Sequence, residues 1–150
     1  MRSVPSVRVV VDTNVFVSGL INPRGAPGTI VDAVIEGRIT PVFSSETLAE
    51  LHDVLARPRL QRFLTRAATP PETLLARLAS VAELVTPGSV VEHIRDPKDA
   101  PFLAVAATRP LPDAIVTGDS DFERGRYGGV PAVSASMLAA ALATDCGRIP

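Results

Sequence analysis

The stretch VRVVVDTNVFVSG, residues 7–19, decides the fold class that the sequence predicts. Valine occupies four of its first five positions, which is typical of a parallel strand buried on both faces. The run ends at Asp12, Thr13 and Asn14, and apolar residues resume directly afterwards. Two interpretations of Asp12 stay open at this point: it caps the following helix, or it holds a carboxylate at the mouth of a site.

Apolar strands and amphipathic helices alternate along the rest of the chain. Further strands are predicted within ITPVFS (39–44), DAIVTGDSD (113–121) and VPAVS (130–134). Helices are predicted over 15–20, 29–38, 45–56 with Ser45 as its N-cap, 69–85 with Thr69 as its N-cap, from Asp99 onward, and 136–143. This alternation predicts an α/β sandwich with a mainly parallel sheet, in which the carboxyl ends of the strands share one ligand-binding edge.

Composition sets broad limits on the class of protein. A chain of 150 residues with 46% hydrophobic and 21% charged residues is most simply one globular domain. The formal net charge of -1 gives no general attraction to nucleic acid, so RNA binding requires a local patch of positive charge. One cysteine excludes an internal disulfide and a cysteine-based zinc site. With neither a signal peptide nor a membrane span in the pattern, we expect a cytoplasmic protein without membrane contact.

Carboxylates stand where the predicted strands end and the helices begin. Asp12 ends the first strand, Asp119 and Asp121 follow a later strand, Asp99 starts a helix, and Glu50 borders an apolar helix stripe. If these acids converge, their mutual repulsion requires a cation to offset it. Oxygen ligands of this kind suit Mg²⁺ or Mn²⁺, and such an ion supports phosphodiester hydrolysis by a bound water.

Each of these acids also has an ordinary structural interpretation. Asp12 and Asp99 could cap helices, and Asp119 and Asp121 could belong to a turn. Glu50 could be a solvated helix residue. Any one of these positions is a weak signal, and their expected convergence on one sheet edge is what favours a site.

Four segments, in this order and spacing, resemble the PIN-domain family: VVVDTNVFVSGL (9–20), SSETLAELHDVLARP (44–58), RDPKDAPFLAVAA (95–107) and IVTGDSDF (115–122). More narrowly, they resemble bacterial toxin components of toxin–antitoxin systems related to the VapC ribonucleases. The resemblance implies a single PIN-like domain over residues 1–150, with a core at about 7–142 and a short C-terminal tail. It also implies a three-layer α/β/α sandwich around the mainly parallel sheet.

The resemblance further implies an endoribonuclease that cuts single-stranded RNA with Mg²⁺ or Mn²⁺. The residues that match the catalytic positions of the family are Asp12, Glu50, Asp99 and Asp119, and those expected to bind metal are Asp12, Asp99, Asp119 and Asp121. Supporting polar positions correspond to Thr13, Asn14 and Thr117. Lys98 and Ala100 stand where the family often has further acids, which leaves the number of metal ions open.

Partners follow from the same resemblance: an RNA substrate, a cognate antitoxin protein and a second copy in a homodimer. The arginines expected to contact RNA phosphates are Arg24, in the loop after the first helix, and Arg124 and Arg126, just after the late acids. His52 is predicted on the inner side of its helix.

Two other functions compete with the nuclease. A haloacid-dehalogenase-type phosphatase also begins with a strand ending in Asp, but it requires a second Asp where this chain has Asn14. A PIN-like RNA- or protein-binding domain with little or no nuclease activity fits the same residues, because geometry decides catalysis.

Overall fold

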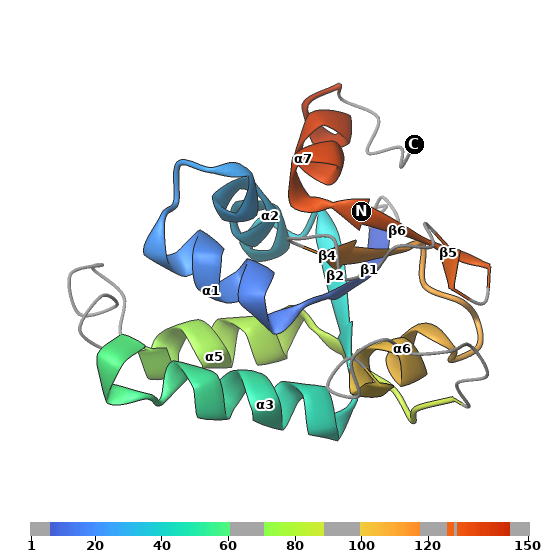
Figure 1. Cartoon of the computed structure of the whole chain (residues 1–150). Helices are drawn as coiled ribbons and strands as arrows, with labels where there is room; N and C mark the ends of the chain where they lie inside the picture. The colour runs from blue at the N-terminus through green and yellow to red at the C-terminus, as the bar shows by residue number, and fades with distance from the viewer. Residues whose placement is uncertain (1–6, 61–70, 89–99, 118–125, 128, 145–150) are drawn as a thin grey trace, which may run out of the picture.

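The central feature of the fold is a six-stranded sheet with strand order β3-β2-β1-β4-β6-β5, flanked by helices (Figure 1). A computed structural model describes residues 7–60, 71–88, 100–117, 126–127 and 129–144. The strands are β1 Val7–Val11, β2 Ile39–Phe43, β3 Glu83–Leu84, β4 Ala114–Thr117, β5 Arg126–Tyr127 and β6 Val130–Ser134. The helices are α1 Thr13–Ile21, α2 Ala26–Ile35, α3 Ser45–Leu55, α5 Pro71–Val81, α6 Ala100–Ala106 and α7 Ala135–Ala143.

Every strand pair in the sheet is parallel except β5 with β6. The predicted α/β class and the mainly parallel sheet are therefore confirmed. The valine-rich strand β1 lies in the middle of the sheet, as its burial on both faces requires.

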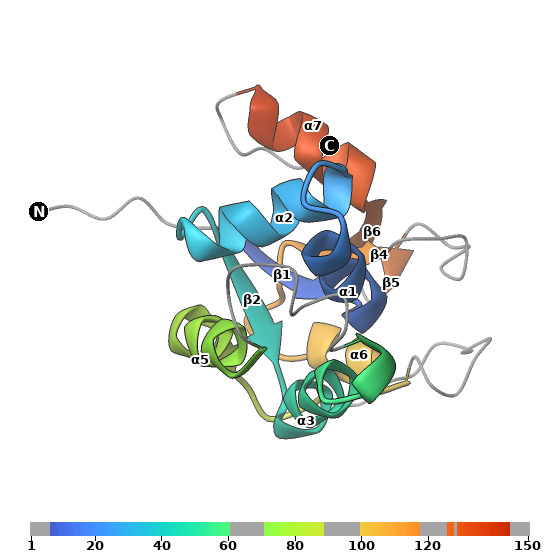
Figure 2. The ribbon, with the colours of Figure 1, turned by 90° about the vertical axis from the view of Figure 1, so that its left-hand side faces the viewer.

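Two hydrophobic clusters cover the two faces of the sheet and make the three layers. Val9 and Val11 of β1 belong to a cluster shared with α1, α2, α3, α5 and α7. Val10 points to the other face, where α6 packs through Phe102 and Val105. Figure 2 shows α2 and α7 on one side of the strands and α6 on the other. The predicted α/β/α sandwich is confirmed.

The order in which strands are added to the sheet reverses at β1. β2 and β3 extend the sheet from one side of β1, and β4 and β6 extend it from the other. In open α/β sheets, the crevice at such a switch in strand order, beyond the carboxyl ends of the strands, is where ligands bind. Here that crevice lies beyond the ends of β1 and β4.

The N-cap of helix α3 lies one residue before the predicted position. Ser44, not Ser45, is the N-cap: its side chain accepts a hydrogen bond from the Thr47 backbone N–H at 3.1 Å. The Thr47 hydroxyl oxygen accepts in return from the Ser44 backbone N–H at 2.9 Å. This reciprocal pair is a capping box with threonine in the place of the usual acid, and it fixes where α3 leaves β2.

Helix α2 is shifted toward the N-terminus relative to the predicted range 29–38. It starts at Ala26 because Pro27 fits the first turn of a helix, where a missing N–H costs nothing. It ends at Ile35 because Gly37 adopts a positive φ of 79°. Gly37 N–H and Arg38 N–H then donate to the carbonyls of Val34 and Ala33, a Schellman arrangement that closes the helix.

The largest error in the predicted elements concerns residues 82–85. The sequence predicts one helix through Val85, but α5 ends at Val81 and residues 83–84 form β3. β3 pairs with β2 through Val42↔Glu83 and Phe43↔Leu84, and Val85 N–H donates to the Phe43 carbonyl. The free edge of β2 decides this conformation, which local helix propensity cannot anticipate. β5 was not predicted, and Thr69 lies outside the described residues.

In the part of the chain that the structure describes, no helix combines the length and the apolar character that a bilayer crossing requires.

Candidate active site

Asp12 lies beside the end of β4 because β1 and β4 are neighbours in the sheet. Val11 pairs with Val116, and the Asp12 N–H donates to the Val116 carbonyl at 3.0 Å. Thr117, the last residue of β4, is buried with 5% of its surface exposed. Asp12 and Thr117 therefore lie at the same carboxyl edge of the sheet.

Asp12 is also the N-cap of α1. Its carboxylate Oδ1 accepts a hydrogen bond from the Asn14 backbone N–H at 3.2 Å. The capping interpretation is thus confirmed, and it is compatible with a second role. A carboxylate at the start of a helix is favoured by the positive end of the helix dipole, and the cap holds it at the edge of the sheet.

Thr13 connects this edge to Glu50. The Thr13 hydroxyl donates to Glu50 Oε2 at 2.9 Å, from a residue of which only 6% is exposed. Glu50 itself is exposed, as the ordinary interpretation of a solvated helix residue expects. However, the bond from Thr13 ties its carboxylate to the start of α1. The Glu50 carboxylate is therefore held at the residue that follows Asp12 in the chain.

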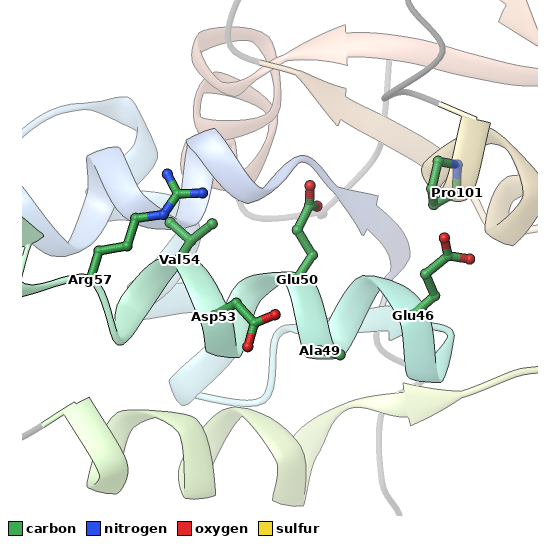
Figure 3. A pocket seen from close by; sticks show the side chains of 7 residues that line it. All are labelled: Glu46, Ala49, Glu50, Asp53, Val54, Arg57 and Pro101. Atoms are coloured by element: carbon green, nitrogen blue, oxygen red, sulfur yellow. The ribbon is translucent and has the colours of Figure 1, made fainter.

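A pocket of about 430 Å³ opens along α3 beside this link (Figure 3). The residues that line it are Glu46, Ala49, Glu50, Asp53, Val54, Arg57 and Pro101. Pro101 is the second residue of α6, so the N-terminus of α6 forms one wall of the pocket. In the sequence, Asp99 directly precedes α6.

Sequence reasoning missed the charged neighbours of Glu50 in this pocket. Glu46 lies four residues before Glu50 on α3, and Asp53 lies three residues after it. Arg57 lies seven residues after Glu50, just beyond the end of α3. These are the spacings that share one face of a helix. The helical period measured from Glu50 is the signal that could have found them.

The remaining predicted site residues are only partly covered by the structure. Asp99, Asp119, Asp121 and Arg124 lie outside the described residues. Asn14 is exposed at the start of α1, next to the acid that it helps to hold.

Two predicted RNA-contacting arginines are not brought to Asp12. Arg24 follows the far end of α1, a helix whose nine residues span roughly 13 Å. The backbone of Arg126 in β5 pairs with Pro131 of β6. The next residue of β6, Ala132, pairs with Ile115 near the start of β4. Arg126 therefore sits toward the opposite end of the sheet, two strands away from β4. Their contacts with RNA stay predictions.

The predicted inner position of His52 is wrong. Its side chain is 66% exposed and lies 3.5 Å from the Asp53 carboxylate. Leu51 and Leu55 form the buried side of α3 instead, because they are the residues that meet the core cluster.

The donors assembled at the candidate site are oxygen atoms, which fits a hard cation such as Mg²⁺ or Mn²⁺. Within the described ranges, no three His, Cys, Asp or Glu side chains gather closely enough to hold a metal ion. A complete ligand set of the predicted kind therefore depends on Asp99 and Asp119 in addition to Asp12.

Comparison with known proteins bears on this arrangement. A family profile described as a PIN domain matches residues 8–121, a range that begins on β1 and contains all five predicted acids. Uncharacterized protein MJ1680 of Methanocaldococcus jannaschii is 36% identical to this chain over 115 residues. The matched region covers 77% of this chain and 72% of that protein.

Proposed function

This chain belongs to the PIN-domain family, and from that membership we propose that it is a metal-dependent endoribonuclease acting on single-stranded RNA. PIN domains are generally nucleases, and they typically use divalent metal ions. The observation that carries the proposal is the Thr13–Glu50 hydrogen bond, made directly after Asp12 at the switch point of the sheet. It holds Glu50 of α3 against the residue that follows Asp12, at the edge of the sheet where a ligand is expected.

The residues that would hold the metal are Asp12, Asp99, Asp119 and Asp121. When bound, Mg²⁺ or Mn²⁺ supplies an acidified water and positive charge for the phosphate and the leaving oxygen. The N-cap bond keeps the Asp12 carboxylate at the end of β1. The Thr13 hydroxyl orients Glu50. The exposed Glu50 carboxylate can then accept a hydrogen bond from the attacking water and so position it.

The same acids would not suit the phosphatase alternative, because Asn14 has no carboxyl to serve as a general acid two residues after Asp12. The other alternative is a PIN-like RNA- or protein-binding domain with little or no nuclease activity. It differs from the nuclease in one measurable respect, since it would bind metal or RNA without cutting.

The proposal is tested by incubating purified protein with a labelled single-stranded RNA in Mg²⁺, in Mn²⁺ and in EDTA. Asp12→Asn and Asp99→Asn variants, each checked for folding by circular dichroism, run beside the wild type. We expect cleavage that requires metal and is abolished by both substitutions. Equal cutting by wild type and variants would assign the activity to a contaminant, and metal binding without cutting would favour the binding domain.

Biological context is proposed from the same resemblance. We propose that the protein is the toxin of a toxin–antitoxin pair, forms a homodimer and acts in the cytoplasm. Its induced expression should then arrest growth in a host cell, and an Asp12→Asn variant should not. Normal growth on expression of an RNA-cutting wild-type protein would argue for a role in RNA processing instead.

A further inference from the structure

A positively charged side chain, Arg57, shares the α3 pocket with the acids. We propose that Arg57 binds a backbone phosphate of the RNA next to the one that is cut, and so positions the strand across the site. This inference rests on the proposed nuclease function and names a substrate-positioning residue for it.

Glu50 and Val54 of α3, and Arg57 two residues beyond the end of α3, line the same pocket. Arg57 follows Glu50 by seven residues, and its backbone N–H donates to the Val54 carbonyl at 3.2 Å, so the chain still turns toward the same side after the helix ends. Figure 3 shows the Glu50 carboxylate and the Arg57 guanidinium on the same side of the helix, with the guanidinium beside Val54. A strand that reaches Glu50 along this face would also pass Arg57.

The guanidinium of Arg57 is available for a ligand. Arg57 is exposed, and among the described residues the ion pairs are those of Arg8, Arg38 and His52. Asp53, which lies one turn before Arg57, is 3.5 Å from His52 and points away from the guanidinium in Figure 3. No carboxylate in the described part of the chain therefore neutralises Arg57.

The charge of the pocket explains why such a residue is needed. The other charged residues that line it are acids, Glu46, Glu50 and Asp53, and they repel an RNA backbone. A metal ion would offset charge only at the phosphate being cut. The neighbouring phosphate requires its own cation, and a guanidinium presents paired N–H donors that match phosphate oxygens.

Arg59 provides a matched control. It is an exposed arginine two residues further along the chain, in helical residues 58–60, and it does not line the pocket. A general effect of removing one positive charge would be the same for Arg57→Gln and Arg59→Gln. A specific phosphate contact affects the first variant alone.

The experiment measures steady-state cleavage of a labelled single-stranded RNA over a range of KCl concentrations. We expect Arg57→Gln to raise KM about tenfold with little change in kcat, since one charged hydrogen-bonded contact is lost. The slope of log KM against log[KCl] should fall by about 0.7, the value for one phosphate contact on a single strand. Arg57→Lys should restore part of KM, and Arg59→Gln should match the wild type.

Binding of the same RNA in EDTA, followed by fluorescence anisotropy, separates the two proposals. If the wild type cuts RNA but Arg57→Gln has the KM and salt slope of the wild type, the inference about Arg57 fails and the nuclease stands. If the wild type cuts nothing, the nuclease fails, and weaker binding with a smaller salt slope for Arg57→Gln alone still supports the phosphate contact. Equal weakening by both glutamine variants would overturn it.

Discussion

The charged side chains near the two ends of strand β1 have different interaction partners. Near the amino end of β1, the Arg8 side chain forms a bidentate pair with Glu83, the first residue of β3, with Nε–Oε1 at 2.9 Å and Nη2–Oε2 at 2.6 Å. Asp113 accepts from the Arg8 backbone N–H at 2.8 Å. At the carboxyl end, the Asp12 carboxylate accepts from the Asn14 backbone N–H, and Glu50 accepts from the Thr13 hydroxyl.

This difference suits a structural role for the acids near Arg8 and the proposed catalytic role for Asp12 and Glu50. The acids at the amino end are satisfied by an arginine and by backbone, so they can stabilise the fold without a ligand. Glu50 forms no ion pair within the described residues. Its carboxylate is therefore not neutralised there and can interact with a bound cation. We therefore expect substitutions near Arg8 to change stability and substitutions near Glu50 to change activity.

The largest difference in RNA cleavage is expected between two acid-to-amide variants, one at each end of the sheet. Asp12→Asn should reduce RNA cleavage on the order of 10²-fold or more, because a metal ligand supplies several kcal/mol to the transition state. Its stability should change little, since asparagine is an equally good N-cap. Asp113→Asn should retain full cleavage per folded molecule. Equal cleavage by the two variants, measured at saturating RNA, would remove the distinction between the ends.

A smaller effect on activity is expected at Thr13. Thr13→Val removes the hydroxyl that orients Glu50 but keeps the shape, so cleavage should fall by about tenfold, as for other residues that support a metal site. Thr13→Ser should recover most of the activity because it keeps the hydroxyl. Cleavage rates of the two variants under identical Mg²⁺ check this, and a fully active Thr13→Val would mean that Glu50 needs no positioning.

Arg8 is expected to affect stability alone. Arg8→Met should lower the free energy of unfolding by about 1 kcal/mol, since the bidentate pair is partly exposed and screened by solvent. Urea denaturation of Arg8→Met, Glu83→Gln and the double variant gives the coupling energy of the pair. A loss of cleavage in folded Arg8→Met would place this arginine in the function and contradict the comparison.

The smallest effect is expected from pH. The hydrogen bond from Arg8, opposed by desolvation, lowers the pKa of Glu83 from its ordinary value of 4.5. A lowered pKa means that the stabilisation is complete above pH 4.5 and is lost as the pH falls through the value in the folded protein. Unfolding curves of wild type and Glu83→Gln should therefore differ near neutrality and converge in acid. A constant difference down to the acid range would contradict this cause.

The sequence predicts the parallel sheet and its functional edge because both rest on strong local patterns. Val7–Val11 is apolar enough to be a central strand, and the position of Asp12 after it follows from chain order alone. Helix starts such as Ser44 were missed by one residue, since two adjacent serines offer the same capping group. β3 could not be found from local patterns, because it depends on the edge of β2. Arg57 follows the helical period of Glu50, but the pocket that it lines depends on a wall from α6, which local patterns do not reveal.

Mn²⁺ titration followed by nuclear magnetic resonance compares the two ends of the sheet in one measurement. Mn²⁺ broadens the amide signals of residues close to it, so each end reports whether the ion binds there. We expect the strongest broadening at Thr13, Asn14 and Thr117, much weaker broadening at Arg8, Glu83 and Asp113, and loss of this pattern in Asp12→Asn. Broadening at Glu83 and Asp113 instead, or the same broadening in Asp12→Asn, would contradict a metal site at the carboxyl end of β1.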